Sequence, residues 1–503
     1  MKKTNAIRIM CAVIAMLMLL CTFVACADNS DDNPADTTTP APDGATTTPV
    51  EGGEVTEPDD GFEDDDVTQD VRFDGKTITM LYWEDREHEE FFVEEQTGDI
   101  VADGIWDRNA IVEDRLGITM EFVPHIGNAD NVVGWTNYVQ TSIQSGGGEF
   151  DVIGGYSLSQ ASCASKSLFY NLLDDSCEYL NFDKPWWPDS LINEATINNK
   201  LLFASGDISA NALYMMYVVF VNNNIIEDLS LPSVYELVDN NKWTFDSFFE
   251  MCNNVYVDQD GSGDKSIGDR FGHITCYLHS DPWFYAPGSL IADKNAEGTL
   301  QLSDSFGGER TVKTLEVLTN FLYNTSDGLF THESNNIEFN NGNVLFISDR
   351  CRISITYFDN EDLDYSVVPF PKFDESQENY STCMGNPFTL YSIPIDATEE
   401  ELPMLSAFLE VYASESYRNV TPALFETSLK IKYSQDNDAA RMYDIVRETL
   451  CFDLGRIFCN VLIGQSHWNM AIEDNISTWA ATAKQLKKPM AAKIKALMKA
   501  YED

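Results

Sequence analysis

The sequence has few positive charges. Its 503 residues include 32 lysines and arginines against 82 aspartates and glutamates, which gives a formal net charge of −50 at pH 7. Proteins that bind nucleic acids depend on cationic side chains that contact phosphates. The composition therefore argues against a nucleic-acid partner, and it also disfavours a polyanionic ligand.

Motifs of several common enzyme classes are missing as well. The chain contains no GxSxG, HExxH, GxGxxG or P-loop pattern. No two of its 11 cysteines form a CxxC pair, so a zinc site or a thioredoxin-like redox centre has no support. Eight cysteines follow Cys26, namely Cys163, Cys177, Cys252, Cys276, Cys351, Cys383, Cys451 and Cys459. Export would permit disulfides; pairing in chain order is the simplest connectivity, but the sequence does not fix it.

The N-terminus has the pattern of an export signal. A short cationic stretch, residues 1–8, precedes an apolar run at residues 9–24 that is too short for a comfortable membrane span. The run ends in FVAC, small residues before Cys26, which is typical of a lipobox whose cysteine is acylated. We expect residues 1–26 to be a lipoprotein signal and the protein to be anchored on the extracytoplasmic side of the cell membrane; an ordinary cleaved signal is the alternative.

Residues 27–70 are predicted to be an acidic tether. They contain no lysine or arginine, are rich in threonine, proline, aspartate and glutamate, and have almost no large apolar side chains. Such a segment cannot bury enough surface to fold. We interpret it as a solvated link between the lipid and the folded body, with a dedicated acidic interaction tail as the alternative.

The body alternates strand and helix patterns, which predicts an α/β fold with largely parallel sheets. In such sheets ligands bind beyond the carboxyl ends of the strands. Trp83 and Tyr156 follow two predicted strands, and Asp207 follows a glycine at the end of an apolar run, where a carboxylate could accept from two vicinal hydroxyls. Core packing for the aromatics and turn capping for Asp207 remain open.

Residues 258–269, DQDGSGDKSIGD, match the pattern of a calcium-binding loop. Glycine at position six permits the sharp turn that an encircled calcium ion requires. Side-chain oxygens stand at positions one, three, five, nine and twelve, where Ser266 at position nine could hold a water, and position seven would offer its backbone carbonyl. The ligands would be Asp258, Asp260, Ser262, Asp264 and Asp269. We predict a structural calcium ion here, with a metal-free turn as the alternative.

Residues 281–288, DPWFYAPG, place three aromatics between two prolines. Three adjacent rings are not expected to face inward together on a strand or an irregular turn. We predict an aromatic shelf in which at least one ring, with Trp283 and Tyr285 as candidates, faces a ligand cleft.

The order of these elements resembles the family 1 extracellular solute-binding proteins, the maltose-binding-like receptors of ABC importers. The resemblance rests on NKWT at 241–244, the acidic loop closing on DRFG at 269–272, PWF at 282–284, KPWWPD at 184–189 and LLFASGDIS at 201–209. It implies a two-lobed type II periplasmic-binding-protein fold with three crossings between lobes. Lobe 1 would comprise residues 71–215 and 368–411, and lobe 2 residues 216–367 and 412–503.

The resemblance also implies ligand contacts. The expected contacts are Trp83, Tyr156, Asp207, Tyr214, Trp283, Tyr285, Arg350 and Phe452. Residues 349–352, DRCR, stand where the family often has an aromatic. Arginines there suggest hydrogen bonds to hydroxyls or to a carboxylate, or an ion pair with a nearby acid.

Two functions of different classes follow. The first is a monomeric, non-enzymatic receptor that binds a small solute, expected to be a sugar or oligosaccharide, and delivers it to the transmembrane subunits of an ABC permease. The second is an exported glycoside hydrolase, since carboxylates and aromatics also line such clefts. The expected order of crossings favours the receptor, and a surface adhesin would leave the aromatic strand ends unexplained.

Overall fold

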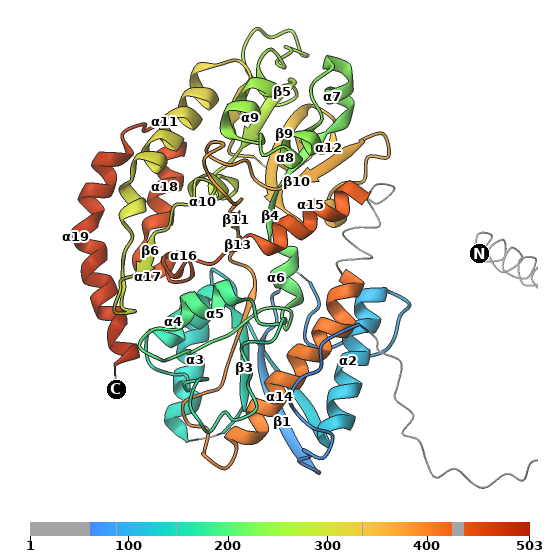
Figure 1. The fold of residues 1–503 in the computed structure, drawn as a ribbon, viewed down its shortest axis with the longest axis vertical. Helices are drawn as coiled ribbons and strands as arrows, with labels where there is room; N and C mark the ends of the chain where they lie inside the picture. The colour runs from blue at the N-terminus through green and yellow to red at the C-terminus, as the bar shows by residue number, and fades with distance from the viewer. Residues whose placement is uncertain (1–60, 87, 147, 334, 425–436, 503) are drawn as a thin grey trace, which may run out of the picture. The chain divides into compact units, whose positions relative to one another are not determined.

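Two β-sheets organise the part of the chain that the computed structural model describes, residues 61–86, 88–146, 148–333, 335–424 and 437–502 (Figure 1). Gly61–Asp503 forms one compact unit. The predicted acylation site, Cys26, lies outside the described residues, as does the predicted tether up to residue 60.

The first sheet has the strand order β12-β3-β1-β2 and defines lobe 1. Its strands are β1 (Lys76–Trp83), β2 (Ile118–His125), β3 (Val152–Tyr156) and β12 (Thr389–Ser392). β1 runs parallel to β2 and β3, and β12 pairs antiparallel with β3. The helices on this lobe are α2 (Ile100–Leu116), α3 (Val132–Ser145), α4 (Ser157–Ala164), α5 (Asp189–Ala195), α6 (Ala210–Tyr214) and α14 (Leu402–Glu415).

The second sheet has the order β10-β4-β9-β5-β8 and defines lobe 2. Its strands are β4 (Tyr217–Asn222), β5 (Phe271–Thr275), β8 (Gly328–Phe330), β9 (Val344–Arg350) and β10 (Tyr365–Val368). β5 is parallel to β8 and β9, whereas β4 is antiparallel to β9 and β10. The predicted α/β class is therefore confirmed, with both sheets mixed.

Helices and short strands complete lobe 2 and the C-terminal layer. The helices are α7 (Asn223–Leu229), α8 (Val234–Asp239), α9 (Phe245–Cys252), α10 (Pro282–Tyr285), α11 (Glu309–Asn324), α12 (Asn335–Asn340), α13 (Ile353–Thr356), α15 (Asn437–Glu448), α16 (Leu454–Ile457), α17 (Cys459–Leu462), α18 (Gly464–Glu473) and α19 (Trp479–Leu497). The short strands are β6 (Ala292–Lys294), β7 (Leu300–Leu302), β11 (Thr382–Cys383) and β13 (Leu450–Cys451).

Local sequence explains the main elements. Every residue of β3 and β4 is buried, as their continuous apolar runs predict for strands covered on both faces. At the start of α2 the carboxylate of Asp99 caps the backbone N–H of Ala102, and the helix ends at Gly117, whose φ of 69° is left-handed. That glycine lets β2 begin one residue later, beside β1.

The chain passes back and forth between the two sheets. It leaves lobe 1 after α6, enters lobe 2 at β4, and returns between β10 and β12. The third passage was expected from a helix ending near residue 412. Instead α14 continues to Glu415 and a short helix, Ser416–Val420, follows it, both packed against α2 of lobe 1. α15 packs on β10 of lobe 2, so residues 412–424 belong with lobe 1.

Residues 61–70, which were expected to belong to the tether, contact lobe 1. The side chain of Val67 is buried, and the carboxylate of Asp65 accepts two hydrogen bonds from Arg115, at 2.5 and 2.7 Å, and one from Ser414 at 2.6 Å. The acidic composition did not predict this contact, because the segment is held to lobe 1 mainly by ion pairs rather than by apolar side chains. The folded part therefore begins near Gly61 rather than at residue 71.

Candidate functional site

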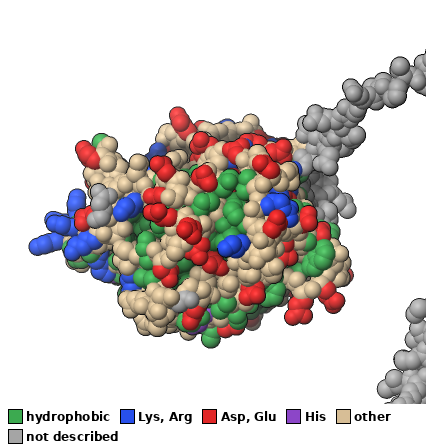
Figure 2. Space-filling model, turned by 90° about the horizontal axis from the view of Figure 1, so that it is seen from below, with side chains coloured by type: hydrophobic (Ala, Val, Ile, Leu, Met, Phe, Trp, Pro, Cys, Tyr) green, Lys and Arg blue, Asp and Glu red, His purple; other side chains and the backbone are tan. Residues whose placement is uncertain are grey.

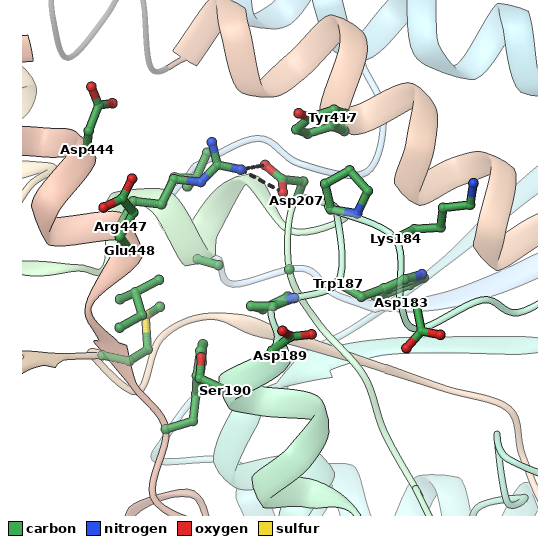
Figure 3. A pocket seen from close by; sticks show the side chains of 18 residues that line it. Asp183, Lys184, Trp187, Asp189, Ser190, Asp207, Tyr417, Asp444, Arg447 and Glu448 are labelled. Atoms are coloured by element: carbon green, nitrogen blue, oxygen red, sulfur yellow. Dashed lines mark hydrogen bonds and ion pairs between the residues drawn. The ribbon is translucent and has the colours of Figure 1, made fainter. Parts of the chain in front are cut away.

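A cavity of about 620 Å³ lies between lobe 1 and the α15–β13 segment (Figure 3). Lobe 1 contributes the loop before α5 and the first residues of α5, the turn at Gly206 and Asp207, the second half of α6, and Tyr417. α15 and β13 contribute the opposite wall. The lining residues are Asp183, Lys184, Pro185, Trp187, Pro188, Asp189, Ser190, Gly206, Asp207, Ala212, Leu213, Met384, Tyr417, Asp444, Arg447, Glu448, Leu450 and Phe452.

An ion pair crosses this cavity between its two walls. Arg447 on α15 donates two hydrogen bonds to the carboxylate of Asp207, at 2.7 and 2.8 Å (Figure 3). The hydroxyl of Thr421 donates a third at 2.7 Å. Asp207 is 5% exposed, and its burial raises the pKa of the carboxyl although Arg447 and Thr421 oppose that rise. Gly206, with φ 153°, approaches the carbonyl of Trp186 so closely that a Cβ would lie 2.1 Å from that oxygen.

The rest of the lining combines carboxylates with aromatic rings. Asp183 and Asp189 flank the lobe 1 loop, and Asp444 and Glu448 lie on α15, which holds Arg447 between them in sequence. Trp187, Tyr417 and Phe452 supply the aromatic surface. The cavity is therefore rich in hydrogen-bond acceptors and also offers apolar ring surface.

A buried glutamate beneath the cavity holds the loop before α5. Glu410 on α14 is fully buried and accepts from the indole N–H of Trp187 at 3.0 Å and from the backbone N–H of Asn181 at 3.2 Å. Burial raises the pKa of Glu410 to about 7, because hydrogen bonds from Trp187 and Asn181 offset only part of the desolvation and Asp65 adds repulsion.

The N-terminal segment 62–67 fixes the rim of the cavity from outside. Lys184 forms ion pairs with Glu63 at 3.0 Å and with Asp66 at 3.1 Å. Phe62 packs edge-on against the ring of Tyr417, with centroids 5.4 Å apart. Two residues of the cavity lining therefore depend for their position on a segment that the composition predicted to be unstructured.

Asp207 and Phe452 are the two predicted contact residues that line the cavity. Trp83 and Tyr156 pack against each other in the core, with ring centroids 5.3 Å apart, and the indole of Trp83 donates to Thr389. Their strands, β1 and β3, pair directly with each other in parallel, so the two rings at the strand ends meet in one buried contact. Tyr214 stacks on His88 with centroids 4.0 Å apart, and neither belongs to the lining.

Arg350 was expected to face hydroxyls, a carboxylate or a nearby acid. Its Nε lies 3.4 Å from an oxygen of the neighbouring Asp349, and its side chain is 13% exposed. Asp349 in turn lies 3.1 Å from His279, so this pair belongs to a buried polar cluster at the end of β9. The ion-pair alternative describes this arrangement.

The structure does not contain the predicted aromatic shelf, because all three rings at positions 283–285 are buried. The segment forms the short helix α10, which turns successive side chains in different directions, and each direction meets core. Trp283 packs against Phe245, Phe248 and Phe249 of α9. The hydroxyl of Tyr285 donates to Asp453 at 3.3 Å.

Several cavity residues were missed from the sequence. Trp187 belongs to the KPWWPD motif that contributed to the family resemblance, but the motif carried no signal about which of its tryptophans reaches a ligand. Arg447 and Tyr417 come from segments more than 200 residues beyond Asp207. Only the packing of α14 and α15 brings those segments beside it, and no local pattern reports such packing.

The acidic loop brings three of its five predicted ligands together. One carboxylate oxygen from each of Asp258, Asp260 and Asp269 lies within 4.8 Å of the others. Asp269 is buried and accepts from the backbone N–H groups of Gln259 and Ser266, whereas Asp258 and Asp260 are exposed. Ser262 and Asp264 follow in the same turn, where the hydroxyl of Ser262 donates to the carbonyl of Asp264. The loop joins α9 to β5 and lies away from the cavity lining.

The eight cysteines after Cys26 are all unpaired in the structure, so the chain-order disulfide pairing is not observed. Burial raises the pKa of each thiol, including those of Cys276 and Cys459 to about 11.

Among the described residues, no helix combines the length and apolar character needed to span a bilayer.

Comparison with known proteins supports the fold. A scan against protein-family models and a search of curated proteins give no match. Solved structures do match. A Staphylococcus aureus extracellular solute-binding protein in complex with maltose is 11% identical over 86% of this chain and 100% of its own, with a TM-score of 0.53.

Two further structures extend this comparison. A maltose/maltodextrin-binding domain from Bdellovibrio bacteriovorus bound to maltotriose is 14% identical over 83% of this chain and 100% of its own, with a TM-score of 0.51. A Mycobacterium tuberculosis protein in complex with glycerophosphocholine is 15% identical over 83% and 98%, with a TM-score of 0.52. The chain has the fold of ABC substrate-binding proteins.

Proposed function

We propose that this protein is an extracytoplasmic solute-binding receptor that holds a carbohydrate in the cavity between lobe 1 and α15 and delivers it to an ABC importer. The observation that carries the proposal is the lining itself, five carboxylates and three aromatic rings on walls that belong to different lobes. A volume of about 620 Å³ falls within the range of small-molecule sites in proteins. The carbohydrate complexes among the structural neighbours support the same ligand class.

The chemistry of the lining suits a polyhydroxylated, uncharged solute. Carboxylates accept hydrogen bonds from hydroxyl groups, and such charge-assisted bonds are strong. Aromatic rings offer apolar surface to the C–H faces of a sugar. An anionic solute would be repelled by Asp183, Asp189, Asp444 and Glu448, because Arg447 is already engaged by Asp207.

Titration calorimetry with a panel of mono- and oligosaccharides tests the proposal, with glycerophosphocholine included because one structural neighbour holds it. Glu448→Gln in the lining is expected to weaken binding by about tenfold, the typical effect of losing a hydrogen bond to a charged group. Glu297→Gln, an exposed residue outside the lining, is the matched control and should bind as the unmodified protein does. Analysis of the recovered sugar distinguishes binding from hydrolysis.

Failure of every member of the panel to bind, with the protein folded, would overturn the carbohydrate assignment. Recovery of shortened saccharides would instead assign a glycoside hydrolase. Both results come from the same samples, so the receptor and the enzyme are separated directly.

We further propose that Cys26 is acylated and attaches the receptor to the cell membrane. The FVAC sequence before residue 27 supports this, together with an apolar run too short to span a bilayer. Cys26→Ser should release the protein from the membrane fraction. A protein that takes up no labelled fatty acid would belong to the freely secreted class.

The acidic loop at 258–269 is proposed to bind calcium in a structural role. Three carboxylate oxygens close to one another form a site of the hard oxygen ligands that calcium prefers. Asp269 stands at the loop position where a glutamate usually occurs. Because the aspartate side chain is one methylene shorter, the backbone of the loop must lie closer to the ion. Binding to the folded state alone stabilises by about 2.7 kcal/mol at a hundredfold excess of calcium over Kd.

Calcium should therefore raise the melting temperature relative to a chelator. The double variant Asp258→Asn/Asp260→Asn should lose that difference, whereas Glu361→Gln/Asp362→Asn, which removes the same charge from another exposed acidic pair, should keep it. A melting temperature that ignores calcium in the unmodified protein would assign the loop as a plain turn.

A further inference from the structure

The long C-terminal helix α19 carries a concentration of positive charge that the rest of the chain lacks. It contains five lysines and no acidic residue between Trp479 and Leu497, and Lys499 follows in the next turn. This occurs in a chain whose acids outnumber its bases by 82 to 32. Figure 2 shows positively charged side chains gathered at the edge of the molecule where α19 lies, whereas acidic side chains are scattered over the rest of that view.

These lysines form one face of the helix. Residues spaced by near-multiples of 3.6 lie on the same side, and this places Lys484, Lys487, Lys488, Lys495 and Lys499 together. All five are exposed. The opposite side is the buried stripe, made by Trp479, Ala483, Leu486, Met490, Ile494 and Leu497. We call the five lysines the α19 lysine face.

The helix dipole explains only part of this pattern. It favours cations in the last turn and its effect decays within that turn. Lys495 satisfies that condition, but Lys484, Lys487 and Lys488 lie in the first half of α19, where the dipole does not favour positive charge. None of the five forms an ion pair with another residue that the structure describes. The face is therefore a set of exposed ammonium groups that form no ion pair within the described fold.

A partly apolar hollow borders the same face. A cavity of about 430 Å³ lies between α19 and the β6–β7 hairpin. Leu300, Leu302, Ala491, Ile494 and Met498 form its apolar wall. Asn198, Thr299, Gln301 and Glu502 add polar groups, and Lys495 belongs both to the lining and to the lysine face. Five exposed ammonium groups beside a recess with one apolar wall match an amphiphile with an anionic head better than they match a purely acidic protein surface.

We propose that the α19 lysine face docks on an anionic phospholipid surface. Lysines near such a surface each strengthen binding by about fivefold. The remainder of this acidic protein is repelled by the same surface, so docking through α19 selects one orientation at the bilayer. Attachment through Cys26 would hold the face within reach of lipid, but the proposal stands on the face and its hollow and is tested without the anchor.

The test measures binding of the Cys26→Ser chain to vesicles by co-flotation. Vesicles of phosphatidylcholine alone are compared with vesicles that also contain phosphatidylglycerol, each at low and at physiological ionic strength. We expect binding to the anionic vesicles only, with weaker binding as salt screens the lysines. The variant K484Q/K487Q/K488Q/K495Q should bind more than about tenfold more weakly.

A matched control removes four positive charges elsewhere. Four exposed lysines lie elsewhere in the fold: Lys76, Lys166, Lys242 and Lys313. The variant K76Q/K166Q/K242Q/K313Q changes the net charge by the same amount and should keep most of the vesicle binding. Absence of binding to anionic vesicles at low salt would overturn the proposal, as would equal loss in the two variants. Concentration-dependent self-association that only the α19 variant abolishes, without vesicle binding, would assign the face to a second copy of the chain instead.

Discussion

The ion pair between Asp207 and Arg447 gives the sharpest test of how the cavity is held together. Arg447 lies on α15, and Asp207 lies in lobe 1 at only 5% exposure. Arg447→Met removes two of the three hydrogen bonds that the carboxylate accepts, leaving the one from Thr421. Breaking a buried ion pair from one side costs about 3–5 kcal/mol. The arginine side chain is 32% exposed, so we expect about 2–4 kcal/mol at alkaline pH.

The effect should depend on pH. Burial already raises the pKa of Asp207, and without Arg447 that pKa should rise further. Protonation of the carboxyl then removes the cost of a buried carboxylate that has lost its arginine. The destabilisation by Arg447→Met should therefore shrink as pH falls from 8 to 5. Asp207→Asn should cost less, about 1–2 kcal/mol, because the arginine can then turn toward water.

Urea unfolding of the two single variants and of the double variant measures the coupling. We expect the double variant to be more stable than the sum of the single changes predicts, by about 1–2 kcal/mol. Arg441→Met is the matched control on the same helix, since Arg441 pairs with the exposed Asp239 and Asp438, and it should cost less than about 1 kcal/mol. Additivity of the two single changes within about 0.3 kcal/mol would refute the view that they form one unit.

Three other predictions follow from burial. Trp283→Ala should destabilise the fold by about 3–5 kcal/mol, whereas Trp283→Phe should keep most of the stability; normal melting with lost sugar binding in the alanine variant would return this residue to the ligand site. Asp65→Asn should cost about 2–3 kcal/mol in thermal unfolding because its carboxylate and Arg115 are both largely buried, while Asp64→Asn, whose carboxylate is 92% exposed, should change little and serves as the control. For Glu410 the folded-state pKa of about 7 lies above the ordinary 4.5, so its carboxyl stays protonated to a higher pH in the folded state than in the unfolded state. The free energy of unfolding should therefore fall by at most about 3 kcal/mol as pH rises from 4.5 to 7. Glu410→Gln should lack that slope in unfolding measured across this interval, and an unchanged slope would show that other groups cause it.

Local patterns were enough to predict the fold class and the acidic loop. The continuous apolar runs of β3 and β4 report strands covered on both faces, and this signal depends only on neighbouring residues. The loop at 258–269 is likewise a contiguous arrangement, so its spacing alone brings the carboxylates of Asp258, Asp260 and Asp269 together. Neither feature needs a distant segment to complete it.

The cavity, by contrast, was decided by tertiary structure. Asp207 could be proposed because it follows a glycine at the end of an apolar run, and Phe452 because the family resemblance implies it. Arg447, the partner of Asp207, comes from a helix that tertiary packing sets beside lobe 1. Trp83 and Tyr156 were expected at open strand ends, yet they pack against each other because other segments close over those ends. Local sequence reports which side chains avoid water. Whether an aromatic ring meets the core or a ligand depends on which distant segment covers it, and only the folded chain determines that.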